Sequence, residues 1–578
     1  MVLINWLYIA LTSFLAGYGI LGLFANLSGY KVRHGIAYIF AGLTFSTVYA
    51  QFFSLFTGVS VAANVGLLIV CIFTTCVYRK ELTEFFENEK RTLQREIWRV
   101  PVYFLLILLF AYGTSRGYMH FDTGLYHAQS IRWIEEYGVV PGLANIQARF
   151  GYNSAAFPLT ALYSMKGIFG QSLHTTAGFF ALLASFMALD LYKLFCGKKV
   201  QLADFARIGL VFYLGVIFSQ MMSPASDYYA QLLLFMILIL WLEEDAYQQE
   251  NRIQNEAPYG PLCILIVYAV TIKFSVAVLL LLVIKPAVML LKSKKWKEIT
   301  MYIVTGFVTA LPFFIRNVII SGWLVYPFAG IDLFDVDWKI PKGQVQYDAM
   351  EIGVYGKGIT DVTKYDTPFV QWCPAWFAGL KALEKLFVLA TMAAFAAGLV
   401  YLIRILVKKQ KQDRIHMDKD KKVLWNRTWD FGLVFAVFSV STIFWFVSAP
   451  LVRYGYAYIT VVPLLMFGQL FIVCCSTKRL QAHVGHFHKA FCFILLCFLL
   501  SRFSGLVTDI LRTWKEPYYV VQMDYIDEEA DIQMVDGIAF YVPREGGQIG
   551  YHKFPSSLLV QPIELRGESI EDAFRQTE

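Results

Sequence analysis

Charged residues are scarce in this 578-residue chain: they make up 16% of it, whereas hydrophobic residues make up 57% and mean hydropathy is +0.53. A soluble globular fold cannot bury that much apolar surface, so a lipid bilayer must be part of the solvent. The net charge of +7 does not indicate nucleic-acid binding. The basic residues stand between apolar runs, where the positive-inside rule places them.

Paired metal-binding cysteines are also missing. None of the nine cysteines forms a CxxC pair, and most lie inside apolar runs, so neither a zinc site nor a disulfide framework is indicated. A basic segment and a clear cleavage site are absent from the N-terminus, which enters an apolar run at once. We therefore expect this run to be a retained membrane span.

What the sequence has in abundance is apolar runs that can cross about 30 Å of hydrocarbon. We expect an all-α polytopic membrane protein with about 14 transmembrane helices, because charged or turn-forming segments separate the runs. One long run, 260–291, is divided at Lys273 because it is too long for a single helix. The expected spans lie near residues 4–25, 35–56, 58–78, 100–115, 172–195, 207–222, 227–242, 260–272, 273–291, 300–319, 384–406, 429–447, 455–475 and 489–506.

Basic segments set the expected orientation and the division of the chain. The linker from Arg79 to Arg99 and the nine Lys and Arg between Arg404 and Arg427 mark the cytoplasmic side. The predicted parts are N-terminal helices and linker (1–99), a transmembrane core (100–506) with a first external loop (115–171) and a long external loop (321–383), and an external α+β cap (507–578) with β-like runs at 537–542 and 558–561.

Residues 153–169 of the first external loop carry polar residues and a proline. We expect a short helix lying on the outer membrane surface, and a crossing helix remains the alternative.

This topology places five ionisable residues on one side of the membrane, each at or beside the end of an apolar helix. They are Asp122, Asp227, Lys273, Arg316 and Arg453. Such charges are costly there unless water, a partner or a ligand meets them. An external carboxylate can act as a general base toward a hydroxyl, and cations facing it can hold a phosphate as it leaves.

Each of these residues also has an ordinary structural interpretation. Asp122 is a favoured N-cap for a helix starting at Thr123, and Asp227 can simply begin the next helix. Arg316 and Arg453 can extend along the membrane interface without binding anything. Asn145, Arg149 and Asn153 recur every four residues, so on a helix they would share one face, as a sugar-binding edge or as a loop brace.

Several segments together resemble the polytopic glycosyltransferases of the C fold (GT-C). Phe121-Asp-Thr-Gly-Leu-Tyr126-His127 is similar to their first external loop, in which an acidic residue carries catalysis. Leu311-Pro312 through Arg316-Asn317 to Tyr326-Pro327, and Ala449-Pro-Leu-Val-Arg453-Tyr, resemble their later patterns. The block from Asp122 to Asn153 and the tail Ile563-Glu-Leu-Arg566-Gly567 look most like bacterial membrane proteins associated with surface polysaccharide.

The resemblance implies an inverting glycosyltransferase that uses a polyprenyl-phosphate sugar and a glycan or lipid acceptor at the external face of a bacterial plasma membrane. Asp122 would be catalytic. The expected substrate-binding residues are Tyr126, His127, Asn145, Arg149, Asn153, Asp227, Lys273, Arg316 and Arg453.

No metal or other cofactor is expected to be required, because Thr123 stands where many members carry Glu. If a divalent ion does bind, its ligands would be Asp122, His127 and Asp227. The alternatives are a flippase or transporter for a lipid-linked glycan, a polysaccharide polymerase or ligase, and a scaffold without catalysis.

Overall fold

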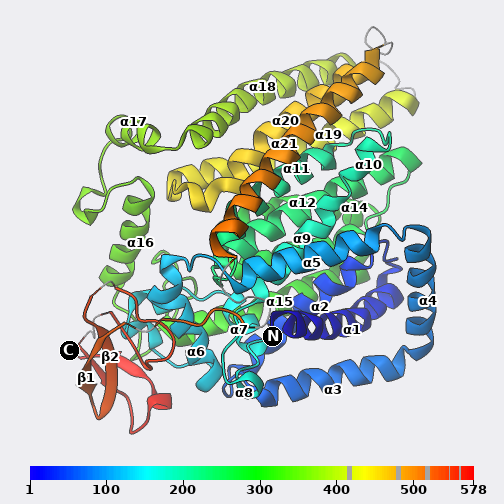
Figure 1. Cartoon of the computed structure of the whole chain (residues 1–578). Helices are drawn as coiled ribbons and strands as arrows, with labels where there is room; N and C mark the ends of the chain where they lie inside the picture. The colour runs from blue at the N-terminus through cyan, green and yellow to red at the C-terminus, as the bar shows by residue number, and fades with distance from the viewer. Residues whose placement is uncertain are drawn as a thin grey trace.

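The computed structural model describes residues 1–412, 419–476, 483–514, 521–526, 528–545, 547–558 and 562–577, without the side chains of 405–412 and 419–428. Long helices dominate it, and Figure 1 shows many of them running side by side. They are α1 (Val2–Ser28), α2 (Ile36–Phe53), α3 (Val61–Val77), α4 (Arg79–Arg95), α5 (Arg99–Ser115), α9 (Thr176–Leu189), α11 (Leu202–Ile217), α12 (Ser226–Asn251), α13 (Tyr259–Ile272), α14 (Ile284–Lys292), α15 (Trp296–Ser321), α18 (Ala382–Gln412), α19 (Lys419–Ser448), α20 (Val452–Cys475) and α21 (Val484–Thr513).

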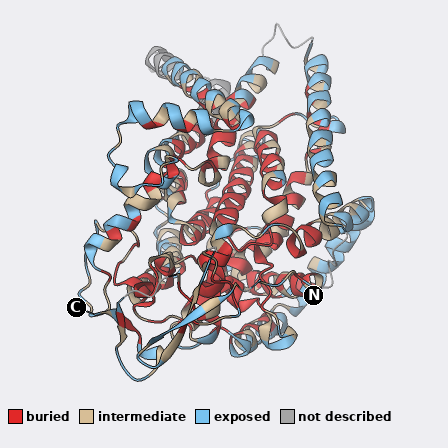
Figure 2. Cartoon of the chain, turned by 60° about the vertical axis from the view of Figure 1, so that its left-hand side comes forward, coloured by how far each residue is buried: buried red, intermediate tan, exposed pale blue. Residues whose placement is uncertain are grey.

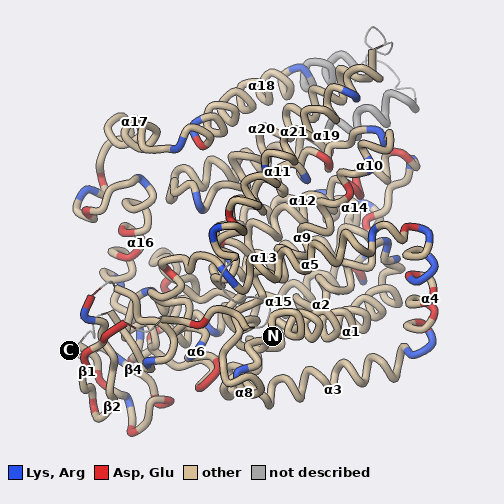
Figure 3. The backbone as a smooth tube through the Cα atoms, viewed as in Figure 1, with Lys and Arg blue, Asp and Glu red and all other residues tan. Residues whose placement is uncertain are grey.

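Within the described residues, ten helices are long and apolar enough to cross a membrane, or eleven if the bent pair α3–α4 counts as one span. The expectation of about 14 spans is therefore not confirmed, although the membrane-protein class is. Three expected spans are missing from this set: α5 and α13 are apolar but only 17 and 14 residues long, and α12, although long, is not among the candidates. Figure 3 shows charged residues gathered toward the helix ends, with largely uncharged spans between them.

Helix α12 is the centre of the bundle. Its stretch 232–239 is 0% exposed at every residue, because α9, α11, α13 and α20 contact it. A helix that is apolar all round is favoured in such a central position. Figure 2 shows the same division, with buried residues concentrated in the inner helices and exposed ones on the outer helices. The two ends of α12 carry charged residues: Asp227 lies in its first turn, and Glu243 and Glu244 lie toward its other end.

The break predicted at Lys273 is present. Helix α13 ends at Ile272, Lys273 is extended (φ −150°, ψ 114°), and a 3₁₀ helix, η5 (Phe274–Val283), leads into α14. The break places a lysine side chain next to the N-terminal end of α12, where it meets Asp227.

The first external loop contains only short elements: a π-helical turn η1 (Thr123–His127), α6 (Ala128–Glu136), two 3₁₀ turns η2 (Leu143–Asn145) and η3 (Ala148–Gly151), α7 (Ala156–Leu162) and α8 (Lys166–Phe169). Residues 153–169 thus form no single helix long enough to span. The expected surface position is wrong for α7, since all seven of its residues are buried and it packs on α2 and α6.

The segment 321–383, expected to be a long external loop, contains regular secondary structure. It contains the helices α16 (Lys342–Gly356) and α17 (Phe369–Gly379), which lie at the edge of the bundle in Figure 1. The side chains after Arg404 that set the expected orientation lie outside the described residues.

The C-terminal segment forms two antiparallel two-stranded sheets. β1 (Ala530–Val535) pairs with β2 (Ile538–Pro543), and β3 (Ile563–Leu565) pairs with β4 (Phe574–Gln576). The described residues beyond α21 contain strands and a 3₁₀ turn, η8 (Ile570–Asp572), but no α-helix, so the segment is β and not α+β. The run predicted at 537–542 corresponds to β2, whereas 559–561 of the run at 558–561 lie outside the described residues.

This C-terminal segment is hydrogen-bonded to the loop of residues 115–171. The Gly124 carbonyl accepts hydrogen bonds from the backbone amides of Ile549 and Gly550 at 2.8 and 3.0 Å. The side-chain amide of Gln129 donates to the Lys553 carbonyl at 2.8 Å. The segment therefore holds the turn that follows Asp122.

Candidate functional site

Four charged side chains from four separate segments meet at one end of the bundle. Asp122 precedes η1, Asp227 lies in the first turn of α12, Lys273 stands at the α13 break and Arg453 lies in the first turn of α20. We call these four residues the charged cluster. They are far apart in sequence, so the fold alone brings them together.

Arg453 is the central member of the charged cluster. Its Nη2 donates to the Oδ2 atom of Asp122 at 2.8 Å, and its Nε lies 3.4 Å from the Oδ2 atom of Asp227. Lys273 donates from Nζ to the Oδ1 atom of Asp227 and lies over the Tyr454 ring, 4.0 Å from its centroid. Two cations and two carboxylates thus alternate, which balances the local charge.

Neither carboxylate serves as a helix cap. Asp122 occupies the N-cap position before Thr123, but its side chain makes no capping hydrogen bond and faces Arg453 instead. The N-cap of α12 is Ala225, and the Asp227 side chain faces Lys273 and Arg453. The capping interpretation of Asp122 is therefore wrong.

Three members of the charged cluster remain accessible. The side chains of Asp122, Arg453 and Lys273 are 25%, 24% and 24% exposed, whereas Asp227 is 8% exposed. Ion pairs that are only partly desolvated can exchange partners with an incoming charged ligand. The accessible members are the ones that a substrate would meet first.

The environment of Asp122 keeps it ionised. Burial is the largest single influence and favours the neutral acid. The charge and hydrogen bond of Arg453, together with the neighbouring His127 and His120, outweigh it, so the pKa of Asp122 lies below its usual value. Burial and Arg453 lower the pKa of His120 to about 4, which keeps that imidazole neutral near pH 7.

His120 joins the cluster although it was not among the expected binding residues. Its Nδ1 accepts a hydrogen bond from the Asp122 backbone amide at 3.1 Å, and its ring contacts the Arg453 guanidinium. The Ser223 hydroxyl accepts from the His120 amide at 2.8 Å. Its position two residues before Asp122 was the only signal in the sequence.

His127 and Tyr126 line the inner side of the same turn. His127 is 2% exposed, and burial lowers its pKa to about 3. Its ring packs on Phe157 at 5.5 Å, and its Nδ1 lies 3.3 Å from the Thr123 hydroxyl. The Tyr126 ring packs between His127 and Tyr152. Both residues thus support the turn from behind.

Asn145, Arg149 and Asn153 do not share a helix face. Two 3₁₀ turns and an extended link replace the helix that their spacing indicated. Asn145 donates to the backbone carbonyls of Trp338 and Phe574 at 2.8 and 3.2 Å, which is a brace between loops. Arg149 lies 3.4 Å from Glu351 of α16.

Arg316 lies in a different environment from the charged cluster. It is 2% exposed, donates from Nη1 to the Ser54 hydroxyl at 2.5 Å, and lies with Nε 3.3 Å from the Asn153 Oδ1 atom. The structure therefore brings together four of the five charged residues that the predicted topology placed on one face. The fifth, Arg316, instead contacts Asn153 of the loop 115–171.

The donor set does not match a metal site. Among the described residues there is no group of three His, Cys, Asp or Glu side chains arranged to hold an ion. Asp122 and Asp227 direct their oxygens at Arg453 and Lys273, and His127 packs behind the turn. The set Asp122, His127 and Asp227 thus does not converge as a ligand shell.

The chain belongs to the family described as "Domain of unknown function (DUF8201)", whose model matches residues 1–460. That span contains every member of the charged cluster. Neither the curated proteins nor the solved structures contain a match to this chain.

Proposed function

We propose that this membrane protein is an inverting glycosyltransferase. It would move a sugar from a polyprenyl-phosphate carrier to a hydroxyl of a glycan or lipid at the external face of a bacterial plasma membrane. The observation that carries the proposal is the accessible pair of Asp122 and Arg453 at 2.8 Å, with Lys273 and Asp227 beside it. A base and phosphate-binding cations are the groups that such a transfer needs.

The proposed reaction is a single displacement. Asp122 accepts the proton of the acceptor hydroxyl, the hydroxyl oxygen bonds to the anomeric carbon, and the bond from that carbon to the phosphate oxygen breaks. The bonding electrons leave with the phosphate, whose charge Arg453 and Lys273 stabilise. Attack from the face opposite the leaving group inverts the anomeric centre.

Arg453 links substrate binding to the strength of the base. In the free protein its guanidinium neutralises Asp122, which lowers the basicity of the carboxylate. A bound lipid phosphate competes for the same guanidinium donors. Asp122 then loses part of its ion pair, its pKa rises toward the range of an effective base, and the base is activated only when the donor is present.

A transporter of a lipid-linked glycan is the second candidate. The observation that favours it is the interrupted helix at Lys273, since broken helices with ionisable residues are common in transporters. The charged cluster at one bundle end, where the chain also holds an accessible carboxylate, favours the transferase.

Purified protein in lipid vesicles, given a labelled polyprenyl-phosphate sugar and a panel of glycan and lipid acceptors, tests the proposal. We expect release of polyprenyl phosphate together with a product of inverted anomeric configuration. Flux of intact donor across the vesicle membrane, without cleavage and unchanged in Asp122→Asn, would establish the transporter instead.

A further inference from the structure

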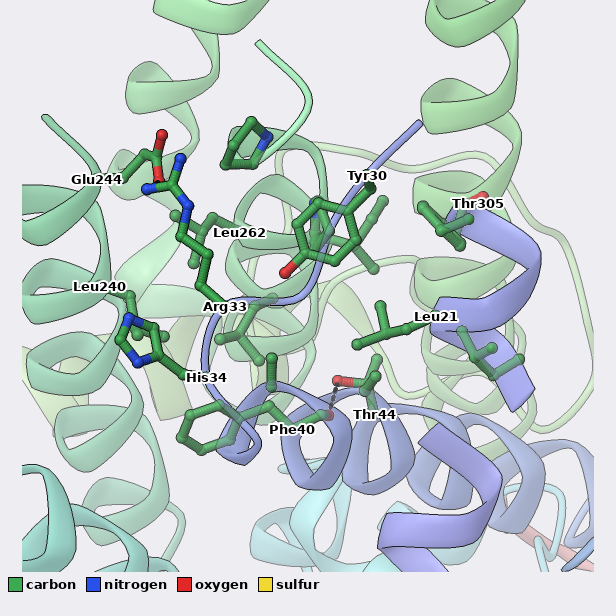
Figure 4. A pocket seen from close by; sticks show the side chains of 18 of the residues that line it. Leu21, Tyr30, Arg33, His34, Phe40, Thr44, Leu240, Glu244, Leu262 and Thr305 are labelled. Carbon is green, nitrogen blue, oxygen red and sulfur yellow. Dashed lines mark hydrogen bonds and ion pairs between the residues drawn. The ribbon is translucent and has the colours of Figure 1, made fainter. Parts of the chain in front are cut away.

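A large cavity opens at the other end of the bundle from the charged cluster. Its volume is about 660 Å³, within the range of ligand pockets. Residues of α1, α2, α12, α13, α15 and the link between α1 and α2 form its walls. Figure 4 shows Leu21, Thr44 and Thr305 on one side of it and Arg33, His34 and Glu244 on the other.

The position of this cavity follows from α12. Asp227 and Glu244 lie on that one helix, and at about 1.5 Å per residue they are about 25 Å apart along its axis. This separation is close to the thickness of the hydrocarbon layer, about 30 Å. The charged mouth of the cavity therefore lies at the membrane face opposite the charged cluster.

The interior offers an apolar surface to its occupant. The hydroxyls of the lining threonines Thr44, Thr305 and Thr309 donate to backbone carbonyls of their own helices at 2.8–2.9 Å. Polar groups that are already satisfied do not require a polar ligand. The remaining wall is mostly aliphatic and aromatic, which suits a hydrocarbon chain.

The cavity also opens sideways toward the bilayer. Val304 and Val308 of α15 line it, and the adjacent Ile303 and Phe307, which do not line it, are 66% and 62% exposed. In a membrane, that exposed surface of α15 meets lipid chains and not water. A hydrocarbon chain can therefore enter between α15 and the neighbouring helices without crossing a polar region.

The mouth carries an uncommitted positive charge. The acids of the mouth are all bonded: Glu244 to Arg33 at 2.7 Å, Glu243 to Arg207, and Glu250 to the Gln201 side-chain amide at 3.3 Å. Lys31 is exposed, and within the described part of the chain it has no ion pair. Arginines neutralise Glu243 and Glu244, whereas Glu250 bonds to a neutral amide. Lys31 is then the cation at the mouth that is left for an anionic headgroup.

We propose that this cavity binds an anionic phospholipid, with one hydrocarbon chain between α2, α13 and α15 and its negatively charged headgroup at Lys31. The lipid site is independent of the proposed transferase activity, because it uses none of the same residues and lies at the other membrane face. A lipid held there fills the space between α1–α2 and the central helices.

Native mass spectrometry of the full-length protein, exchanged into mixtures of phosphatidylglycerol and phosphatidylcholine with identical chains, tests the proposal. We expect the wild type to retain about fivefold more phosphatidylglycerol, the preference that one lysine near a membrane surface supports. Lys31→Ala should remove the preference but keep lipid bound. Ala41→Trp, which fills the apolar interior, should remove both lipids.

Lys90→Ala is the matched control, because Lys90 is an exposed lysine of α4, which does not line the cavity. Lys90→Ala should retain both lipids as the wild type does. Equal thermal unfolding midpoints for the wild type and Ala41→Trp should show that Ala41→Trp is folded. Unchanged retention in Ala41→Trp, or an unchanged preference in Lys31→Ala, would overturn the proposal. So would Lys31-dependent binding of inorganic phosphate by a protein that retains no lipid, since the ligand would then be a soluble anion.

Discussion

Two ion-pair groups at opposite ends of the bundle are each built around an arginine that faces carboxylates, but the two groups differ in accessibility. Around Arg207, the partners Asp204, Asp190 and Glu243 and the Met187 carbonyl surround a guanidinium that is 2% exposed. Around Arg453, the guanidinium is 24% exposed, and its Nε faces Asp227 at 3.4 Å without a hydrogen bond within the described chain. The first group is closed and fixes helices together; the second can accept a ligand.

Substitution of Arg453 should have the largest effect on activity. Arg453→Ala removes both the partner of Asp122 and the proposed phosphate contact, so we expect the transfer rate to fall by about 10³-fold. Arg453→Lys keeps the positive charge but cannot make bidentate hydrogen bonds, so its transfer rate should lie between those of wild type and Arg453→Ala. The transfer rate of each variant, measured with a labelled polyprenyl-phosphate sugar, tests this prediction.

Arg544→Ala is the control for Arg453, because Arg544 is a 56% exposed residue of the C-terminal segment paired with Asp531. It should remain within about twofold of wild type, as exposed pairs contribute little. Equal losses in both variants would show that the loss in Arg453→Ala does not come from the charged cluster.

Two lysines sharpen the comparison. Lys273→Met should lower activity by about tenfold with little change in stability, because Arg453 still faces Asp227. Lys285→Met should instead lower stability by about 3 kcal/mol, since Lys285 is the cation between Asp245 at 2.7 Å and Asp430 at 2.6 Å. Measurement of the activity per folded molecule and the thermal midpoint of Lys273→Met and Lys285→Met tests these two predictions. The reverse pattern would refute them.

The pH profile should depend on Arg453. In wild type the pKa of Asp122 is lowered, so the ionised base persists as pH falls and is lost only below the usual carboxyl range. In Arg453→Gln, burial still raises the pKa and the main opposing charge is gone, so the acid limb of kcat/KM should move to higher pH. An unmoved limb would show that Asp122 is not the titrating base.

Two glycines test the docking of the C-terminal segment, with the smallest expected effect. A Cβ at Gly142 (φ +66°) would lie 1.9 Å from the Phe574 carbonyl oxygen, whereas Gly170 (φ +73°) has open space around it. Both alanine variants carry similar backbone strain, of about 1 kcal/mol. Only Gly142→Ala should expose the C-terminal segment to protease; equal cleavage would mean that this contact does not hold the segment.

The sequence was most informative where one physical signal dominated. Lysine inside an apolar run identified the break at Lys273, and basic loops placed Asp122, Asp227, Lys273 and Arg453 on one face, where the structure brings them into contact. The count of about 14 spans was not confirmed, because hydrophobicity alone does not separate a short buried helix such as α13 from a crossing one.

The remaining features depend on contacts distant in sequence. The four-residue spacing of Asn145, Arg149 and Asn153 indicated a helix, but hydrogen bonds to Trp338 and Phe574 favour 3₁₀ turns there. Local sequence carries no sign of such contacts. The same reason explains why His120 was missed and why Arg316 was grouped with the charged cluster.

Separate measurement of donor binding and donor cleavage on Asp122→Asn tests the central claim most directly. Asp190→Asn is its matched control, because Asp190 is 28% exposed and pairs with Arg207 in the closed group. We predict that Asp122→Asn binds the polyprenyl-phosphate sugar but cleaves it at least about 10²-fold more slowly, whereas Asp190→Asn does both at nearly the wild-type level. Cleavage by Asp122→Asn at the wild-type rate would contradict the account.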